Sequence, residues 1–129
     1  MRNVVILLVA SCGLHVVNID ADEVQRGADV AIETWEEALP IVERLDVFGY
    51  PVADMPRQCR LPQFRRVEGC ALRPGSAFPG ARARILVAND GDDIAEITTA
   101  EIGHLVFWGE PHNCDPADLE CLDDHIGEP

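Results

Sequence analysis

An apolar stripe between residues 24 and 39 constrains the fold more than any other feature of this sequence. Apolar side chains recur there every three or four residues, which is the pattern of a helix that buries one face. Asp20 precedes the stripe as a good N-cap, and Glu23 completes the spacing of a capping box. Pro40 is expected to end or kink this helix. The residues of the stripe are Val24, Ala28, Ile32, Trp35 and Leu39.

Two short apolar runs supply strands for such a helix to cover. Residues 15–19 are rich in β-branched side chains, and residues 83–88 form an apolar run that ends in an acidic turn. Residues 41–47 fit either a continuation of the helix or a strand. After the turn, Asp92 or Asp93 is placed to cap a second helix. In 129 residues, this order predicts one small α+β domain with a long helix packed on a small sheet.

The first eleven residues have the layout of an export signal. A short positive start (residues 1–3) precedes an apolar run and then small residues before Cys12. This segment also resembles a bacterial lipobox, which implies cleavage after residue 11 and a lipid on Cys12. We therefore expect an exported domain over 12–129, anchored to a membrane by that lipid or free in the periplasm or outside the cell. The alternative is that the apolar run is a buried strand of a cytosolic α/β protein.

The remaining cysteines favour export. Apart from Cys12 there are four, in two locally spaced pairs, and four cysteines allow three connectivities. The bridges Cys59–Cys70 and Cys114–Cys121 close the shortest loops. The first would cross-link residues 50–80, a segment rich in proline and glycine that is expected to be irregular. A cytosolic protein would instead keep these thiols free.

The charge distribution disfavours nucleic acid as a partner. The formal net charge is −13, whereas phosphate binding requires a basic surface. All ten basic residues are arginines, and seven of them fall between residues 57 and 84. This arginine-rich segment either binds a protein partner or neutralises acidic residues elsewhere in the fold. The seven are Arg57, Arg60, Arg65, Arg66, Arg73, Arg82 and Arg84.

A glutamate and two histidines carry the strongest functional signal. Glu101 and His104 are three residues apart, so a helix places them on one face, one turn apart. Gly109 is expected to end that helix and to return the chain so that His112 comes within reach. A carboxylate and an imidazole at this spacing occur in metal sites and in acid–base catalysis.

The stretch around Glu101 resembles the zinc-binding helix of the metzincin metalloproteases, His-Glu-x-x-His-x-x-Gly-x-x-His. Residues 101–105 match the centre of that pattern, and residues 109–112 match its closing Gly-x-x-His. A strand followed by a long helix, and later a strand, an acidic turn and a helix, also resemble the order of the metzincin domain. The resemblance implies a zincin-like fold and a zinc ion held by His104 and His112. It further implies that Glu101 is the general base that activates water, with a peptide or protein as substrate.

The chain departs from the metzincin pattern in three ways. Ala100 stands where the first histidine ligand belongs, and its methyl group cannot bind metal. Four residues rather than two separate His104 from Gly109, which turns the chain that follows by about 200° if the helix continues. No methionine follows His112, although the family places one beneath the metal.

The resemblance and the N-terminal signal together predict an exported, metzincin-like zinc metalloprotease homologue. The three departures predict that its active site is impaired. Metal binding would persist if Glu101 itself became a ligand, or if His15 or His125 reached the site. The alternative function, from a different class, is a non-catalytic, disulfide-stapled surface module that binds a protein partner.

Overall fold

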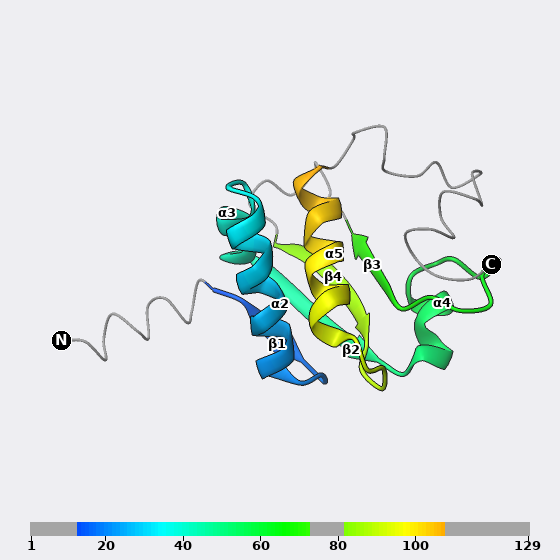
Figure 1. Cartoon of the computed structure of the whole chain (residues 1–129). Helices are drawn as coiled ribbons and strands as arrows, with labels where there is room; N and C mark the ends of the chain where they lie inside the picture. Colours follow the sequence, from blue (N-terminus) through cyan, green and yellow to red (C-terminus); the bar gives the residue numbers. More distant parts are fainter. Residues whose placement is uncertain (1–12, 73–81, 108–129) are drawn as a thin grey trace.

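The computed structural model describes residues 13–72 and 82–107 of the chain. At its centre is a four-stranded mixed sheet in the order β1-β2-β4-β3 (Figure 1). The strands β1 (His15–Val17), β2 (Leu45–Tyr50) and β4 (Ala83–Ala88) are parallel. The strand β3 (Gly69–Leu72) pairs antiparallel with β4 and is the last strand on its side of the described sheet.

Two long helices cover one face of this sheet. The helices α2 (Ala21–Thr34) and α5 (Ile94–Val106) lie side by side in Figure 1, and α5 also packs on β3 and β4. Two short helices, α3 (Ala38–Val42) and α4 (Met55–Gln58), and a 3₁₀ turn, η1 (Val52–Asp54), lie in the connections. The predicted α+β class, with a long helix on a small sheet, is thus confirmed.

Each face of the sheet carries its own hydrophobic cluster. Successive side chains of a strand point to opposite faces, so Ile85 and Val87 of β4 join the cluster under α2 and α5. Leu86 and Ala88 join a second cluster, which includes Met55 of α4. β4 is therefore buried on both faces, which explains why its sequence is a nearly continuous apolar run.

The helix α2 begins at the predicted N-cap. Oδ1 of Asp20 accepts hydrogen bonds from the N–H groups of Asp22 and Glu23, at 3.0 and 3.2 Å. These bonds satisfy amides that have no partner inside the first turn of a helix. The Glu23 side chain pairs with Arg26 one turn further on, so the reciprocal half of the predicted capping box is wrong.

The helix α2 ends earlier than the apolar stripe predicts. Its last residue is Thr34, because Trp35 adopts an extended backbone conformation. Pro40 does not end a helix; it lies in the first turn of α3. A proline is tolerated there because the N–H that it lacks would have no partner within the helix. Leu39, expected in the buried stripe, is 48% exposed. The prediction of one helix extending to Pro40 is therefore wrong.

The other predicted elements are confirmed with some changes of limits. The strand at residues 83–88 has the predicted ends, and β1 covers the first part of residues 15–19. Residues 41–47 contain both the end of α3 and the start of β2. The segment 50–80, expected to be irregular, contains α4 and the short strand β3. Asp93 occupies the N-cap position of α5, but its side chain makes no capping hydrogen bond.

Candidate functional site

The helix α5 places Glu101 and His104 one turn apart, as the sequence predicts. The buried side of the helix includes Ile94, Thr98 and Ile102, which turn it toward the sheet. Glu101 lies on this side and is only 3% exposed, whereas His104 is partly exposed. The carboxyl of the pair therefore lies in the interior and the imidazole lies nearer the surface.

The Glu101 carboxyl lies against β3, at a residue without a side chain. A Cβ added at Gly69 would be 3.0 Å from both Cγ and Oε2 of Glu101, and 2.6 Å from Cγ2 of Ile97. Real Cβ atoms essentially never come within 2.6 Å of another atom, and a contact of 3.0 Å is tighter than nine in ten real ones, so the bare α-carbon of Gly69 leaves space for both Ile97 and the carboxyl. Sequence reasoning missed Gly69, because its role depends on the strand pairing that brings β3 next to α5.

Burial changes the acid strength of Glu101. Loss of hydration raises the pKa of its carboxyl from 4.5 to about 8. Within residues 13–72 and 82–107, no hydrogen bond or ion pair to the carboxyl compensates for that loss. At neutral pH the carboxyl is therefore mainly protonated. Carboxyls perturbed in this way concentrate at functional sites.

The position of the missing zinc ligand faces solvent. Ala100 is exposed, and it lies one turn before His104 on the same side of α5. His112, the other predicted ligand, lies outside the described residues. Among the residues that are described, no group of three or more His, Cys, Asp and Glu side chains is arranged to hold a metal ion. The described part of the predicted site thus consists of Glu101 and His104.

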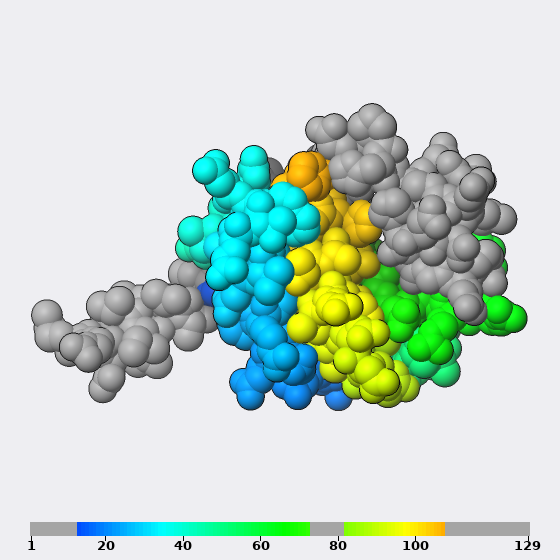
Figure 2. Space-filling view, viewed as in Figure 1, coloured from blue at the N-terminus to red at the C-terminus, as the bar shows by residue number. Residues whose placement is uncertain are grey.

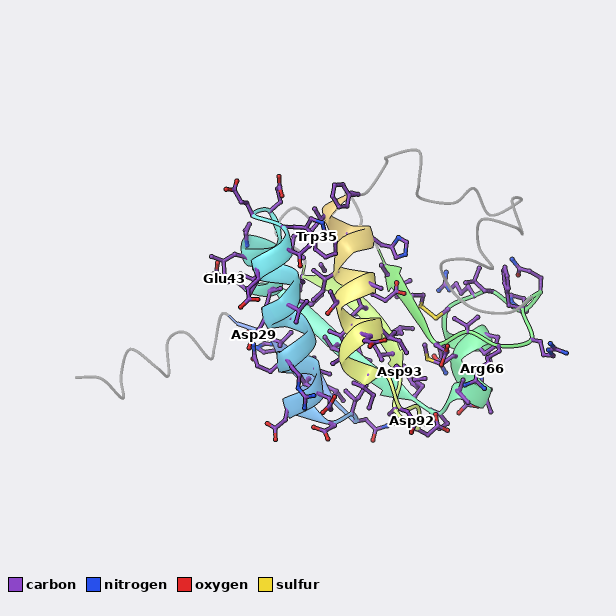
Figure 3. All side chains as sticks on the ribbon, in the orientation of Figure 1. Asp29, Trp35, Glu43, Arg66, Asp92 and Asp93 are labelled. Carbon is purple, nitrogen blue, oxygen red and sulfur yellow. A yellow bond between two sulfur atoms is a disulfide. The ribbon has the colours of Figure 1, made fainter. Side chains whose placement is uncertain are left out.

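An aromatic side chain packs against the end of α5 next to this pair. Figure 3 shows Trp35 between the end of α2 and the last turns of α5. A Cβ added at Gly103 would lie 2.7 Å from Cη2 of Trp35. The ring of Phe107, the C-cap of α5, meets the indole edge to face at a centroid distance of 5.9 Å. Trp35 therefore packs against the residue that precedes His104.

One of the two predicted disulfides is present. Cys59, the C-cap of α4, is bonded to Cys70 of β3, and both residues are buried in the second hydrophobic cluster. Cys114 and Cys121, predicted to form the other bridge, and the lipidation candidate Cys12 lie outside the described residues. None of the helices in the described part of the chain has the length and apolar character needed to cross a bilayer.

Arg82, from the arginine-rich segment, has a structural role at the starts of the parallel strands. Its Nε atom donates to Oδ1 of Asp46 at 2.7 Å, and its Nη2 atom donates to the carbonyl oxygens of Gly13 and Leu45. Nδ1 of His15 lies 3.3 Å from the same Asp46 oxygen. These contacts join β1, β2 and the start of β4, and the Arg82–Asp46 pair is an example of the neutralisation across the fold that the charge distribution left open.

Other arginines of this segment lie on the surface near the disulfide. Arg57 is 3.9 Å from Asp54, and Arg66, labelled in Figure 3, is 3.4 Å from Glu68. Both guanidinium groups are at least half exposed, so these ion pairs contribute little to stability. Arg73 lies outside the described residues.

A hollow of about 450 Å³ lies between α2 and the N-terminal half of α5. Figure 2 shows the face of the molecule on which these two helices meet. Arg26 and Val30 of α2 and Ala95 and Thr99 of α5 line the hollow, together with carboxylates at its rim. Glu101 is not among the lining residues, so the hollow is separate from the Glu101–His104 pair.

Compared with models of known protein families, with curated proteins and with solved structures, the chain matches none.

Proposed function

We propose that this protein is a metzincin-like zinc metalloprotease homologue with an impaired active site. The observation that carries the proposal is the placement of Glu101 and His104 one turn apart on α5, beside the terminal strand β3. In the metzincin resemblance a glutamate and a histidine at this spacing correspond to the general base and to one zinc ligand; here the Glu101 carboxyl lies in the interior and the His104 imidazole lies nearer the surface.

The order of the elements supports the same proposal. A strand, β1, is followed by a long helix, α2, with Trp35 at its end, and the strand β4 is followed by an acidic turn and α5. This is the order that the metzincin resemblance implies. Many α+β domains share parts of this order. It supports the proposal because the Glu-x-x-His pair lies on α5, the helix that follows the acidic turn.

The terminal strand β3 suggests how a peptide would bind. One edge of β3 pairs with β4, and the described sheet has no strand on its other edge. An extended peptide can add to such an edge through main-chain hydrogen bonds. Gly69 of β3 lies against Glu101, so a peptide on this edge would lie near the carboxyl. The proposed substrate or partner is therefore a peptide or an extended protein segment.

Within this proposal the histidines and Glu101 have different roles. His104 and His112 would hold the zinc, and Glu101 would take a proton from the attacking water. Zinc, when bound, supplies Lewis acidity toward a peptide carbonyl. Ala100 offers no ligand, and the raised pKa of Glu101 leaves little of the basic carboxylate form at neutral pH. Both features favour an impaired enzyme over an efficient one.

Zinc content of the purified full-length protein tests the proposal. We expect bound zinc in the wild-type protein and its loss in His104→Ala, whereas Glu101→Gln, which keeps both histidines, should retain it. His15→Ala is the matched control, because His15 is an exposed histidine on β1, and β1 lies at the opposite edge of the described sheet from β3, against which Glu101 packs. Absence of zinc from every preparation, or equal zinc in His104→Ala and wild type, would reject the proposal.

A second candidate function is a non-catalytic, disulfide-stapled module that binds a protein partner. The Cys59–Cys70 bridge and the exposed guanidinium groups of Arg57 and Arg66 favour it. An acidic partner would suit this surface. A protein that never contains zinc, but whose binding to an acidic peptide is weakened by Arg57→Glu and Arg66→Glu, would support this function over the first.

Export and lipid anchoring through Cys12 are part of the proposal. The mass of the mature protein provides the test: we expect the loss of residues 1–11 and a diacylglyceryl group on Cys12. A mature chain that still begins at Met1, with free thiols under denaturing conditions, would support a cytosolic protein instead.

A further inference from the structure

Glu101 reaches its buried position because β3 has a different function on each face. Gly69 and Ala71 face α5, whereas Cys70 points to the opposite face and is bonded to Cys59 at the end of α4. This alternation follows from the pleat of the strand. Two adjacent residues of β3 thus contact opposite layers of the molecule.

The Gly69 position cannot shift toward α5 without displacing the carboxyl. A methyl group at that point would already be within 3.0 Å of Cγ and Oε2 of Glu101. The gap between β3 and the Glu101 side chain is therefore a few tenths of an ångström too small for a methyl group, unless the carboxyl moves. A small change in the position of β3 changes the space available to the carboxyl.

The strand β3 needs an anchor other than its hydrogen bonds. It has four residues, and in the described sheet only β4 pairs with it. Elements with few contacts open locally at a lower free energy than the core of a fold. The disulfide joins β3 to α4, and Met55 of α4 is completely buried in the second cluster. The bridge thus holds β3 to the core from the face opposite Glu101.

We infer that Gly69 is a positioning residue for the Glu101 carboxyl, and that the Cys59–Cys70 disulfide holds Gly69 in the place where it encloses that carboxyl. The inference rests on the proposed function only in treating Glu101 as the catalytic carboxyl. The bridge and the glycine together form a two-part clamp, one part on each face of β3.

The test observes the Glu101 carboxyl directly in the metal-free, full-length protein. Glutamate labelled with ¹³C at the carboxyl carbon gives one resonance per residue, and the resonance lost in Glu101→Gln identifies Glu101. At pH 6 a carboxyl enclosed as in this structure is protonated, whereas an exposed glutamate is ionised. The resonance position therefore reports whether the carboxyl is still enclosed.

Two variants remove the two parts of the clamp separately. Gly69→Ala is made in an Ile97→Ala background, which removes the 2.6 Å contact and leaves the contact with Glu101. Cys59→Ala with Cys70→Ala removes the bridge and adds no volume. We expect both to move the Glu101 resonance toward that of an ionised, exposed glutamate. Gly91→Ala is the matched control, because a Cβ at Gly91 meets no atom within 4 Å, and it should leave the resonance unchanged.

An unchanged Glu101 resonance in folded protein of both variants would overturn the inference. Movement in the glycine variant alone would overturn the role assigned to the disulfide. If the glycine variant does not fold, the cysteine variant decides the result, since it introduces no steric conflict. Because the protein is metal-free, this result is independent of zinc content: a moved resonance with no zinc in any preparation rejects the proposed function and keeps the clamp.

Discussion

The indole ring of Trp35 occupies the space that a side chain at Gly103 would need. A Cβ at Gly103 would lie 2.7 Å from Cη2 and 3.2 Å from Cζ3 of Trp35. The ring also meets Phe107 edge to face. The end of α2 and the end of α5 are thus joined by an aromatic contact that depends on a glycine in the last turn of α5.

Gly103→Ala should destabilise the protein although it improves helix propensity. Alanine is better than glycine in a helix by about 1 kcal/mol. Insertion of a methyl group into a tightly packed contact typically costs about 1–3 kcal/mol, and the rigid indole cannot fold away. We expect a net loss of roughly 1 kcal/mol in urea unfolding. In a Trp35→Leu background the same substitution should become neutral or stabilising, and a stabilised single variant would contradict the packing argument.

Glu101→Gln should remove a pH dependence from the stability. The folded-state pKa of about 8 lies above the ordinary value of 4.5, so the folded protein holds this proton more tightly than the unfolded chain. The contribution of the group is complete below about pH 4.5, decreases between pH 4.5 and 8, and is lost above pH 8.

The pKa difference corresponds to about 5 kcal/mol of unfolding free energy over this pH range. Relative to Glu101→Gln, the wild-type protein should therefore lose stability as the pH rises from 4.5 to 8. Urea unfolding at several pH values measures the difference. Glu96→Gln, exposed on the same helix, controls for the loss of a negative charge from α5. Parallel wild-type and Glu101→Gln curves would show that the carboxyl is not enclosed.

Reduction of Cys59–Cys70 should weaken the fold without a change in its surface charge. The bridge closes a loop between residues 11 positions apart, and a loop of this size typically contributes roughly 2–3 kcal/mol through the unfolded chain. We expect a lower urea midpoint in a phosphine reductant. The Cys59→Ala, Cys70→Ala variant should show the lower midpoint without reductant, and any further effect of the phosphine on it would come from other cysteines.

Ala100→His should strengthen zinc binding. Position 100 is exposed and lies one turn before His104, so the new imidazole can turn toward the same metal. Even an outer-shell partner changes metal affinity by roughly tenfold or more, and a direct ligand should change it by at least that factor. Competition with a chromogenic chelator measures the affinity. Glu96→His, exposed one turn further from His104, should have no such effect, and an equal effect of both variants would indicate nonspecific binding.

The sequence predicts elements well where local pattern and burial agree. The strand at 83–88 has the predicted ends because it is buried on both faces and, apart from Arg84, reads as an apolar run. The N-cap Asp20 and the nearest-neighbour disulfide Cys59–Cys70 are also correct, since each depends on residues close in the chain. The spacing of Glu101 and His104 on α5 belongs to the same class.

Features that depend on long-range packing could not be predicted from the local sequence. The stripe that predicted a helix as far as Leu39 continues past Trp35 in the sequence, but Trp35 has an extended backbone and packs on α5, so the helix ends at Thr34. The strand β3 has only four residues and forms by pairing with β4. Gly69, the residue that makes room for Glu101, therefore carries no signal until β3 and α5 are placed together.

The strands β2 and β4 contribute side chains to both hydrophobic clusters. Loss of α2 and α5 would expose one face of these strands to solvent, and loss of the layer that contains α4 would expose the other face. Neither layer can persist as a stable remnant once its opposite has melted, because both depend on the same two strands. The domain should therefore come apart in a single all-or-none step, with the amides of β2 and β4 the last to exchange with solvent.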